Sequence, residues 1–399
     1  MREVPRCLNQ RLVRQRADRR RWCIGLGLAL PVAALASETS RTHRVGEGER
    51  FKTLQDALKA ARSGDVIEVR PADYRGESAV LDFPRLTIRG LGRGAVFHAD
   101  GQHAEGKAIL VVRGDIVLEN LELRGARVPD GNGAGIRFES GRLAVRRCRF
   151  FDNEMGILTA NEGDMQLEVV DCQFGAAPRH EGALRHLLYV GRIGAFSVSG
   201  SRFGQGWRGH LLKSRAQHNR VLYNYLVDGP TGEASYELEF PEGGQNIVVG
   251  NVIAQSARSQ NPDLLSMGAE ARGGARHSLV VAHNTFVNLG DASARFLHLW
   301  RERLTGDVQV QAINNLLAGP GQWPVGAAED GDGNRRVQLE QLRDPLGGDF
   351  RLRSESALIG AAVHSSRLYT PTAEFALPAG TRLLVAGTKL TPGAFSSAN

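Results

Sequence analysis

A short sequence pattern recurs along most of this chain and limits the folds that it can adopt. The pattern is a valine, two further residues, an Asn, Cys or Ser, one more residue and a large apolar side chain. The polar or thiol residue of the pattern falls at Asn120, Cys148, Cys172, Ser201, Asn224, Asn251, Asn284 and, more loosely, Asn314. Successive members are between 23 and 33 residues apart. A period of this length indicates a solenoid of stacked structural units.

The length of the repeat favours one kind of solenoid. Intervals near 28 residues are too short for a propeller blade, and the leucine spacing of leucine-rich repeats is missing. Three short strands and three turns fit this length, and they make one coil of a parallel β-helix. The 48 Gly and the 6% aromatic content agree with many turns between short strands. We therefore expect an all-β protein, a single-stranded right-handed parallel β-helix with a short N-terminal capping helix.

The two ends of the repeat region carry different patterns. From Phe51 to Ala61 apolar residues recur at helical spacing, and Val66–Val69 alternates as a strand does. A short helix at this place predicts a cap over the open end of the β-helix core. The repeat fades from about residue 318, and residues 347–362 resemble the closing coil of β-helix proteins. Residues 37–399 are thus expected to form one β-helix domain.

The Asn, Cys and Ser residues of the repeat should stack into a ladder inside the β-helix. Neighbouring coils lie about 4.8 Å apart, so that side-chain amides can bond to one another. Cys148 and Cys172 are neighbours in this ladder. They form either a disulfide in an oxidising compartment or a pair of stacked small core residues. Their place in the ladder favours the second interpretation.

Residues 1–36 differ in composition from the rest of the chain. They carry eight Arg and two acidic residues, which accounts for +6 of the net charge of +7. The basic excess therefore lies outside the β-helix, and nucleic acid is not an expected partner. A cleaved export signal typically has an apolar run that ends in a small-residue cleavage motif. Here the run is Ile24–Leu35, and the motif Ala34-Leu35-Ala36 lies at its end. The arginines at 19–21 resemble a twin-arginine signal.

An uncleaved membrane anchor is the alternative for this leader. The apolar run has about 12 residues, whereas a membrane span needs about 20. We therefore expect cleavage, and a mature protein of residues 37–399 that is periplasmic or secreted, monomeric and free of the membrane.

Lys213 is the most conspicuous candidate for a functional residue. The chain has only five Lys, at 52, 59, 107, 213 and 389, against 45 Arg. Burial or neighbouring charges can lower the pKa of a lysine until its amine acts as a base. A chain that otherwise uses Arg for positive charge thus has a Lys in one of its central coils.

A second strand should precede each ladder position and place Lys213 in a column of side chains. The segments that predict it are 135–139, 156–160, 186–191, 210–214, 235–240, 264–268 and 295–300. Because alternate side chains of a strand point to opposite faces, Tyr189, Lys213 and Glu239 should lie outward, one above another. Glu237 is expected to share this face. In such a cluster Lys can accept a proton, Tyr can donate one, and Glu can tune the Lys. Further candidates nearby are His186, Arg208, His210, Arg215, Tyr236 and Glu270.

These central coils resemble a known family. Residues 211–224, LLKSRAQHNRVLYN, and 282–288, AHNTFVN, are similar to coils of the family-six polysaccharide lyases, the chondroitinase B and alginate lyase group. Residues 51–77 also resemble the N-terminal coil of pectate-lyase-like β-helix proteins. The resemblance implies that Lys213 removes the proton next to a uronate carboxylate before the glycosidic bond is eliminated.

Two positions depart from the pattern of that family. Its lyases hold calcium with acidic residues a few positions before the lysine, where this chain has Gly206 and Arg208. Their catalytic arginine lies in the next coil, where this chain has Leu238–Glu242. We therefore expect no metal ligands and no cofactor, although the family would imply calcium. Arg208 and Arg215 are the cations expected to neutralise a substrate carboxylate.

Together these observations predict an exported carbohydrate-active protein. We expect a lyase that acts on a uronate-containing polysaccharide, or an epimerase, which begins with the same proton abstraction. The expected catalytic residues are Lys213, Tyr189, His210 and Arg215. The expected substrate-binding residues are His186, Arg208, Tyr236, Glu237, Glu239 and Glu270. Two alternatives are a non-catalytic polysaccharide-binding β-helix and a glycoside hydrolase that uses Glu237, Glu239 or Glu270.

Overall fold

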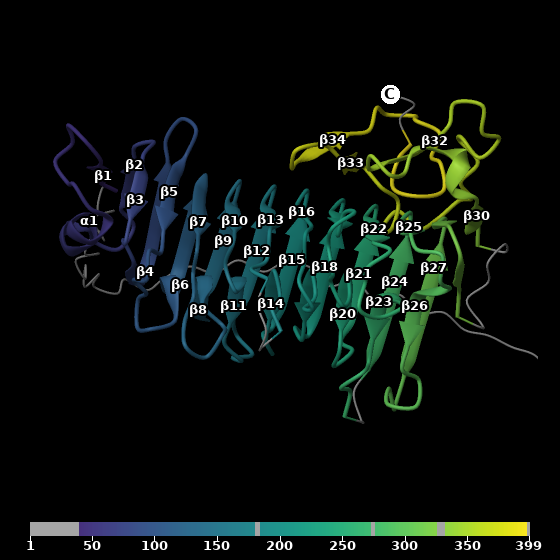
Figure 1. The fold of residues 1–399 in the computed structure, drawn as a ribbon, viewed down its shortest axis with the longest axis horizontal. Helices are drawn as coiled ribbons and strands as arrows, with labels where there is room; N and C mark the ends of the chain where they lie inside the picture. The colour runs from purple at the N-terminus through teal and green to yellow at the C-terminus, as the bar shows by residue number, and fades with distance from the viewer. Residues whose placement is uncertain (1–39, 180–183, 273–275, 325–331, 397–399) are drawn as a thin grey trace, which may run out of the picture. The chain divides into compact units, whose positions relative to one another are not determined.

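The computed structural model describes residues 40–179, 184–272, 276–324 and 332–396. The expected export signal at 1–36 lies outside these described residues. Residues 40–399 belong to one compact unit, in which short strands stack coil upon coil (Figure 1). None of the helices in the described ranges is both long and apolar enough to cross a bilayer.

Each coil supplies three strands, and each strand pairs in parallel with its counterpart in the next coil. The first row is an 11-stranded sheet. Its strands are β3 (Asp73–Arg75), β5 (Ala95–His98), β7 (Leu121–Arg124), β10 (Arg149–Phe151), β13 (Gln173–Gly175), β16 (Arg202–Phe203), β19 (Tyr225–Val227), β22 (Val252–Gln255), β25 (Thr285–Asn288), β28 (Leu316–Ala318) and β30 (Arg335–Val337).

The second and third rows form one 19-stranded sheet, because the long strands β4 (Ala79–Gly90) and β6 (Ala108–Glu119) run through both. The second row continues with β8 (Ala134–Ser140), β11 (Met155–Thr159), β14 (Leu188–Val190), β17 (Leu212–Ser214), β20 (Leu238–Phe240), β23 (Asp263–Met267), β26 (Ala294–Leu299) and β29 (Gly321–Gln322). The third row also contains β1 (Thr42–Val45), β2 (Val66–Val69), β9 (Arg142–Arg146), β12 (Gln166–Val170), β15 (Ala195–Ser199), β18 (His218–Leu222), β21 (Gln245–Val249), β24 (His277–Ala282) and β27 (Val308–Ile313). The predicted parallel β-helix is confirmed.

The core lies inside the coils, where inward side chains from the three rows meet. Identical residues often stack: the rings of Phe150, Phe174 and Phe203 lie 4.7 and 4.6 Å apart in successive coils. At the N-terminal end, helix α1 (Leu54–Ala60) buries Leu54 and Ala57 against this core. The predicted cap is therefore present.

The predicted ladder is present. At two of its positions, however, the prediction named the residue directly before the one that occupies the ladder. From Asn224 through Asn251 to Asn284, each side-chain amide donates to the side-chain oxygen of the next, at 2.9 Å in both steps. The ladder then continues to Asn315 and Asn334, so the expected member Asn314 was wrong. Leu121 holds the position expected for Asn120.

The displacement has a local cause. Asn120 and Asn314 have φ of 52° and 56°, so they occupy the left-handed turn position just before the ladder. Asn tolerates this backbone conformation better than most residues, and the repeat pattern matched the turn instead of the ladder. Cys148 and Cys172 do lie in the ladder as free, buried thiols, and the Cys148 N–H donates to the Cys172 sulfur at 3.4 Å.

The C-terminal segment does not form the expected closing coil at 347–362. After a 3₁₀ turn (η1, Leu339–Gln341), it makes two antiparallel hairpins. Their strands are β31 (Leu342–Asp344), β32 (Asp349–Leu352), β33 (Ala373–Phe375) and β34 (Thr381–Leu383). Phe350 and Phe375 pack on Tyr225, at 6.0 and 5.2 Å between ring centroids. The segment covers apolar side chains that point outward from the first row, because a large exposed apolar patch would be unfavourable.

Candidate functional site

The outward column that the alternation predicts is present in the second row. Tyr189 on β14 pairs in register with Lys213 on β17, which pairs with Glu239 on β20. The leucine before each of these residues is completely buried. The repeat thus presents three chemically different side chains on one face, at successive coil positions.

Two more residues complete what we name the Lys213 cluster: Tyr189, Lys213, Arg215, Glu239 and Glu270. The Lys213 Nζ lies 3.3 Å from Glu239 Oε2 and 3.1 Å from Glu270 Oε1. Arg215 donates to the Glu270 carboxylate through Nε at 2.9 Å and through Nη2 at 2.6 Å. Its Nη1 donates to the Tyr189 hydroxyl. The backbone N–H of Glu270 bonds to the carbonyl of Pro241 at 2.7 Å, which ties this turn to the preceding coil.

A second column, three positions before the first, borders the cluster. The rings of His186, His210 and Tyr236 follow one another across three coils in edge-to-face contact, with centroids 4.6 Å apart at each step. The backbone N–H of His210 donates to His186 Nδ1 at 2.9 Å. The ring atom Nδ1 of His210 lies 3.1 Å from Glu239 Oε2. Burial is the main reason that the pKa of His210 lies well below its usual value, and the nearby Lys213 charge adds to the effect. Both imidazoles are therefore neutral at neutral pH, since the pKa of His186 is lowered in the same way.

The two carboxyl groups of the cluster have displaced pKa values of opposite sign. Burial raises the pKa of Glu239, and the Lys213 charge offsets only part of the effect. Partial burial also acts to raise the pKa of Glu270, but the bonds from Arg215 and Lys213 outweigh it and leave that pKa lowered. Burial and the charge of Glu239 raise the pKa of Tyr236 to about 12. Glu239 is thus the carboxyl suited to hold a proton, and Glu270 the one suited to stay ionised.

Glu237 does not share the outer face, so that prediction was wrong. The backbone register places it in a column with Leu211 and Leu264, which belong to the core. The chain bends before β20, and positions 237 and 238 both point inward. Glu237 is fully buried, and neither carboxylate oxygen has a hydrogen-bond partner among the described residues. Burial, followed by the charge of Asp228, raises its pKa well above the usual range.

The buried carboxyl group of Glu237 leads to a prediction about the free energy of unfolding. Glu237→Leu is expected to stabilise the fold by about 1–3 kcal/mol near neutral pH, the usual cost of an unsatisfied buried polar group. Because its pKa is raised in the folded state, the folded protein binds a proton more tightly than the unfolded chain does. Wild-type stability should therefore fall as pH rises above the unfolded carboxyl pKa of about 4.3.

Urea unfolding of wild type and Glu237→Leu across this pH range measures the difference, which should grow with pH. Glu302→Leu, at an exposed turn position, is the matched control and should show no such trend. A pH-independent difference between wild type and Glu237→Leu would contradict the assignment of a buried, titrating carboxyl.

Arg208 lies in a turn beside Trp207. It has φ of 56° in a turn, its side chain is exposed, and its guanidinium carbon lies 5.1 Å from the centroid of the Trp207 ring. Arg215 is therefore the arginine that the fold brings to Lys213. The substrate-binding role expected for Arg208 stays a prediction.

Three further residues lie on the same face and were not predicted from the sequence: Glu242, Ser266 and His298. Glu242 lies 3.5 Å from Arg215, as measured to its Nε. Ser266 and His298 continue the Tyr189 column by register, one coil each. The alternation that placed Lys213 also applies to segments 264–268 and 295–300, so it could have identified His298. No comparable sequence signal points to Glu242, which lies in a turn.

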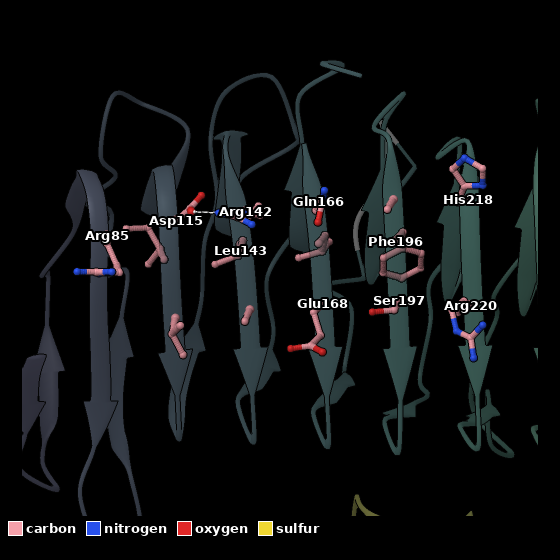
Figure 2. Close-up of a pocket in the computed structure, with 15 residues that line it drawn as sticks. Arg85, Asp115, Arg142, Leu143, Gln166, Glu168, Phe196, Ser197, His218 and Arg220 are labelled. Carbon is pink, nitrogen blue, oxygen red and sulfur yellow. Dashed lines mark hydrogen bonds and ion pairs between the residues drawn. The ribbon is translucent and has the colours of Figure 1, made fainter. Parts of the chain in front are cut away.

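A separate groove of about 520 Å³ lies on the outer face of the third row. Figure 2 shows its polar lining on neighbouring strands, including Arg85, Arg142, Glu168 and Arg220. Arg142 pairs there with Asp115 at 2.6 Å, and the two side chains are 66% and 38% exposed. None of the predicted site residues lines this groove. The buried and mutually bonded groups lie at the Lys213 cluster, which is the stronger candidate for chemistry.

Comparisons with known proteins support the fold. A scan against protein-family models found no match, and a search of curated proteins found none either. Among solved structures, pectate lyase Pel9A is similar with 14% identity and a TM-score of 0.56, over 90% of this chain and 96% of that one. Pectin methylesterase PemA from Erwinia chrysanthemi is also 14% identical, with a TM-score of 0.32, over 79% of this chain and 98% of that one. The first likeness shows a pectate-lyase-like parallel β-helix; at this identity it concerns the fold alone.

Proposed function

We propose that this protein is an exported polysaccharide lyase that acts on a uronate-containing chain at the Lys213 cluster. One observation carries the proposal: Lys213 and Arg215 jointly bind the carboxylate of Glu270, whose side chain is 41% exposed. A uronate carboxylate has the same geometry and charge as this group. A substrate carboxylate that displaces Glu270 would take its place on the Arg215 guanidinium, which would neutralise it, and would lie beside the Lys213 amine.

Neutralisation of the carboxylate makes the neighbouring C–H bond acidic, because the developing negative charge spreads onto the carboxylate oxygens. The amine of Lys213 takes that proton. The C–H electrons form the new carbon–carbon double bond, and the glycosidic C–O bond breaks. Tyr189, whose hydroxyl is bonded by Arg215, is placed to give a proton to the departing oxygen.

Lys213 must be unprotonated to accept this proton, and Glu239 offers a place for the proton of its amine. The Lys213 Nζ lies 3.3 Å from Glu239 Oε2, and burial raises the pKa of that carboxyl, so a proton can pass between them. Closure by a bound substrate would exclude water and strengthen this exchange.

Pectate is the first substrate to test, because one of the solved structures that share this fold is a pectate lyase. Export rests on the composition of residues 1–36, and the family-six resemblance stays a prediction. The proposed mechanism needs no cofactor. Arg215 supplies the positive charge that the resemblance would assign to calcium.

A glycoside hydrolase is the second candidate, and the opposite pKa displacements of Glu239 and Glu270 favour it. A proton-holding and an ionised carboxyl are what such enzymes use. Both groups contact the same Nζ, at 3.3 and 3.1 Å. Two oxygens that share one nitrogen lie closer together than the about 6.5–9.5 Å of inverting enzymes, so a retaining reaction would be expected.

Incubation of the mature protein with polygalacturonate, alginate and glycosaminoglycans tests these proposals. A lyase releases products that absorb ultraviolet light, because elimination creates a double bond conjugated with the carboxyl group. A hydrolase releases reducing ends without that absorbance. Binding without new reducing ends would instead support a non-catalytic role, and the absence of both binding and turnover on every chain would overturn the proposal.

Glu270→Gln distinguishes the two reactions, because it should improve the kinetics of a lyase and impair those of a hydrolase. In a lyase the loss of the competing carboxylate should lower KM for a polyuronate about tenfold, equivalent to ~1.4 kcal/mol. In a hydrolase the loss of an ionised catalytic carboxyl should abolish turnover. Steady-state kinetics measures both, with Glu302→Gln as the control at an exposed position. An unchanged KM and kcat would show that Glu270 competes with nothing.

A further inference from the structure

A second polar and aromatic cluster lies farther along the same face. We name it the His298 cluster: Asp263 on β23, Arg295 and His298 on β26, and Trp300 directly after β26. His298 Nδ1 lies 2.8 Å from Asp263 Oδ2, and Arg295 donates to the other Asp263 oxygen. The rings of His298 and Trp300 are 4.4 Å apart. These contacts fix four side chains, none of which the proposed reaction uses.

The His298 cluster is continuous with the Lys213 cluster. Lys213 pairs in register with Glu239, Glu239 with Ser266, and Ser266 with His298. Three steps between adjacent strands separate Lys213 from His298 by about 14 Å along the direction in which the coils stack. A polysaccharide that follows this column could contact both clusters at once, with a few sugar units between them.

The chemistry of the cluster suits an acidic sugar. Asp263 is 1% exposed and acts as the inner partner, whereas the side chains of Arg295 and His298 are 42% and 22% exposed. With Nδ1 bonded to the buried carboxylate, His298 presents Nε2 outward for a sugar hydroxyl. Arg295 donates to Asp263 through Nε. Its remaining guanidinium N–H groups can donate to a carboxylate of the sugar.

Trp300 is held in place beside these groups. Its indole N–H donates to the Ser266 hydroxyl at 3.1 Å, and the guanidinium carbon of Arg303 lies 5.2 Å from its ring centroid. The partly exposed indole therefore gives the cluster a rigid apolar wall. A sugar ring packed against its accessible edge would keep its hydroxyl and carboxyl groups near His298 and Arg295.

We propose that the His298 cluster is a second binding subsite, which holds a uronate residue of the chain several units from the one at Lys213. The ligand class rests on the function proposed above. The subsite contributes affinity for long chains and takes no part in bond breaking. Short oligomers reach only one cluster, whereas long ones span both and gain from the second contact.

The test compares affinity for oligogalacturonates of increasing length by calorimetry in wild type, His298→Ala and Trp300→Phe. Wild-type affinity should rise once the oligomer spans both clusters, and His298→Ala should lower long-chain affinity about tenfold without affecting the dimer. Trp300→Phe keeps an apolar ring but loses the bond to Ser266, so it should give a smaller loss. Arg220→Ala, which removes an exposed cation from the third row, should behave as wild type.

Two results would overturn the subsite: a wild-type affinity independent of chain length, or an equal loss for short and long oligomers in His298→Ala. Lys213→Met separates this outcome from failure of the proposed reaction. If Lys213→Met keeps full turnover while His298→Ala loses long-chain affinity, the assigned base is wrong and the subsite stands. If Lys213→Met loses turnover but His298→Ala binds long chains normally, the reaction stands and the subsite falls.

Discussion

Lys213→Met is expected to lower kcat on a polyuronate by about 1,000-fold, within the about 10²–10⁴-fold that general acid–base groups contribute. Methionine keeps the unbranched length of the side chain but cannot accept a proton. The substitution also leaves Glu239 without its cationic neighbour, so the buried carboxyl should become neutral and tolerate the change. Rates measured by ultraviolet absorbance, together with circular dichroism to verify folding, provide the comparison.

Lys107 offers a matched control for this substitution. Its amine also lies between two carboxylates, 3.3 Å from Glu105 and 2.8 Å from Glu139. Lys107→Met removes the same charge from a similar ionic setting in an earlier coil, and it should leave turnover intact. Equal activity of the wild type and Lys213→Met, or equal losses in the two variants, would contradict a catalytic role for Lys213.

The second large effect concerns the asparagine ladder. Asn251→Leu should destabilise the fold by about 4 kcal/mol, because it leaves more than one buried polar group unpaired at about 1–3 kcal/mol each. The Asn251 side chain accepts from the Asn224 N–H at 2.8 Å and donates to the Val221 carbonyl at 2.8 Å. Leucine of similar volume supplies neither bond.

Urea denaturation measures the loss, with Gln245→Leu as the control. Gln245 is exposed on β21 of the same coil, so that change should shift stability by no more than about 0.5 kcal/mol. If Asn251→Leu were as stable as Gln245→Leu, the ladder would not be a significant source of stability. The fold would then rest mainly on apolar packing between coils.

Local periodicity predicted the fold and much of the candidate site. The recurrence of Val and Asn established the coil length, and strand alternation then placed Tyr189, Lys213 and Glu239 in one column. Both inferences depend on regular geometry that every coil repeats. They succeeded where the backbone is regular.

The predictions failed where the backbone departs from that regularity. A bend before β20 turns Glu237 into the core, and left-handed turn residues at Asn120 and Asn314 imitate ladder members. The role of Glu270 depends on how far its side chain reaches from a turn to Arg215 and Lys213. No spacing rule contains that information, because the contact joins residues 55 and 57 positions apart.

The C-terminal hairpins have a consequence for how the protein comes apart. A stack of coils would ordinarily unravel from its free end, one coil at a time. Here the tail reaches back: the hydroxyl of Tyr225 bonds to the Gly348 carbonyl at 2.8 Å, and the Gly380 N–H bonds to the Gly200 carbonyl at 2.7 Å. Fraying of the last coils therefore requires release from coils more than a hundred residues upstream. The C-terminal segment should therefore slow the unwinding of the late coils.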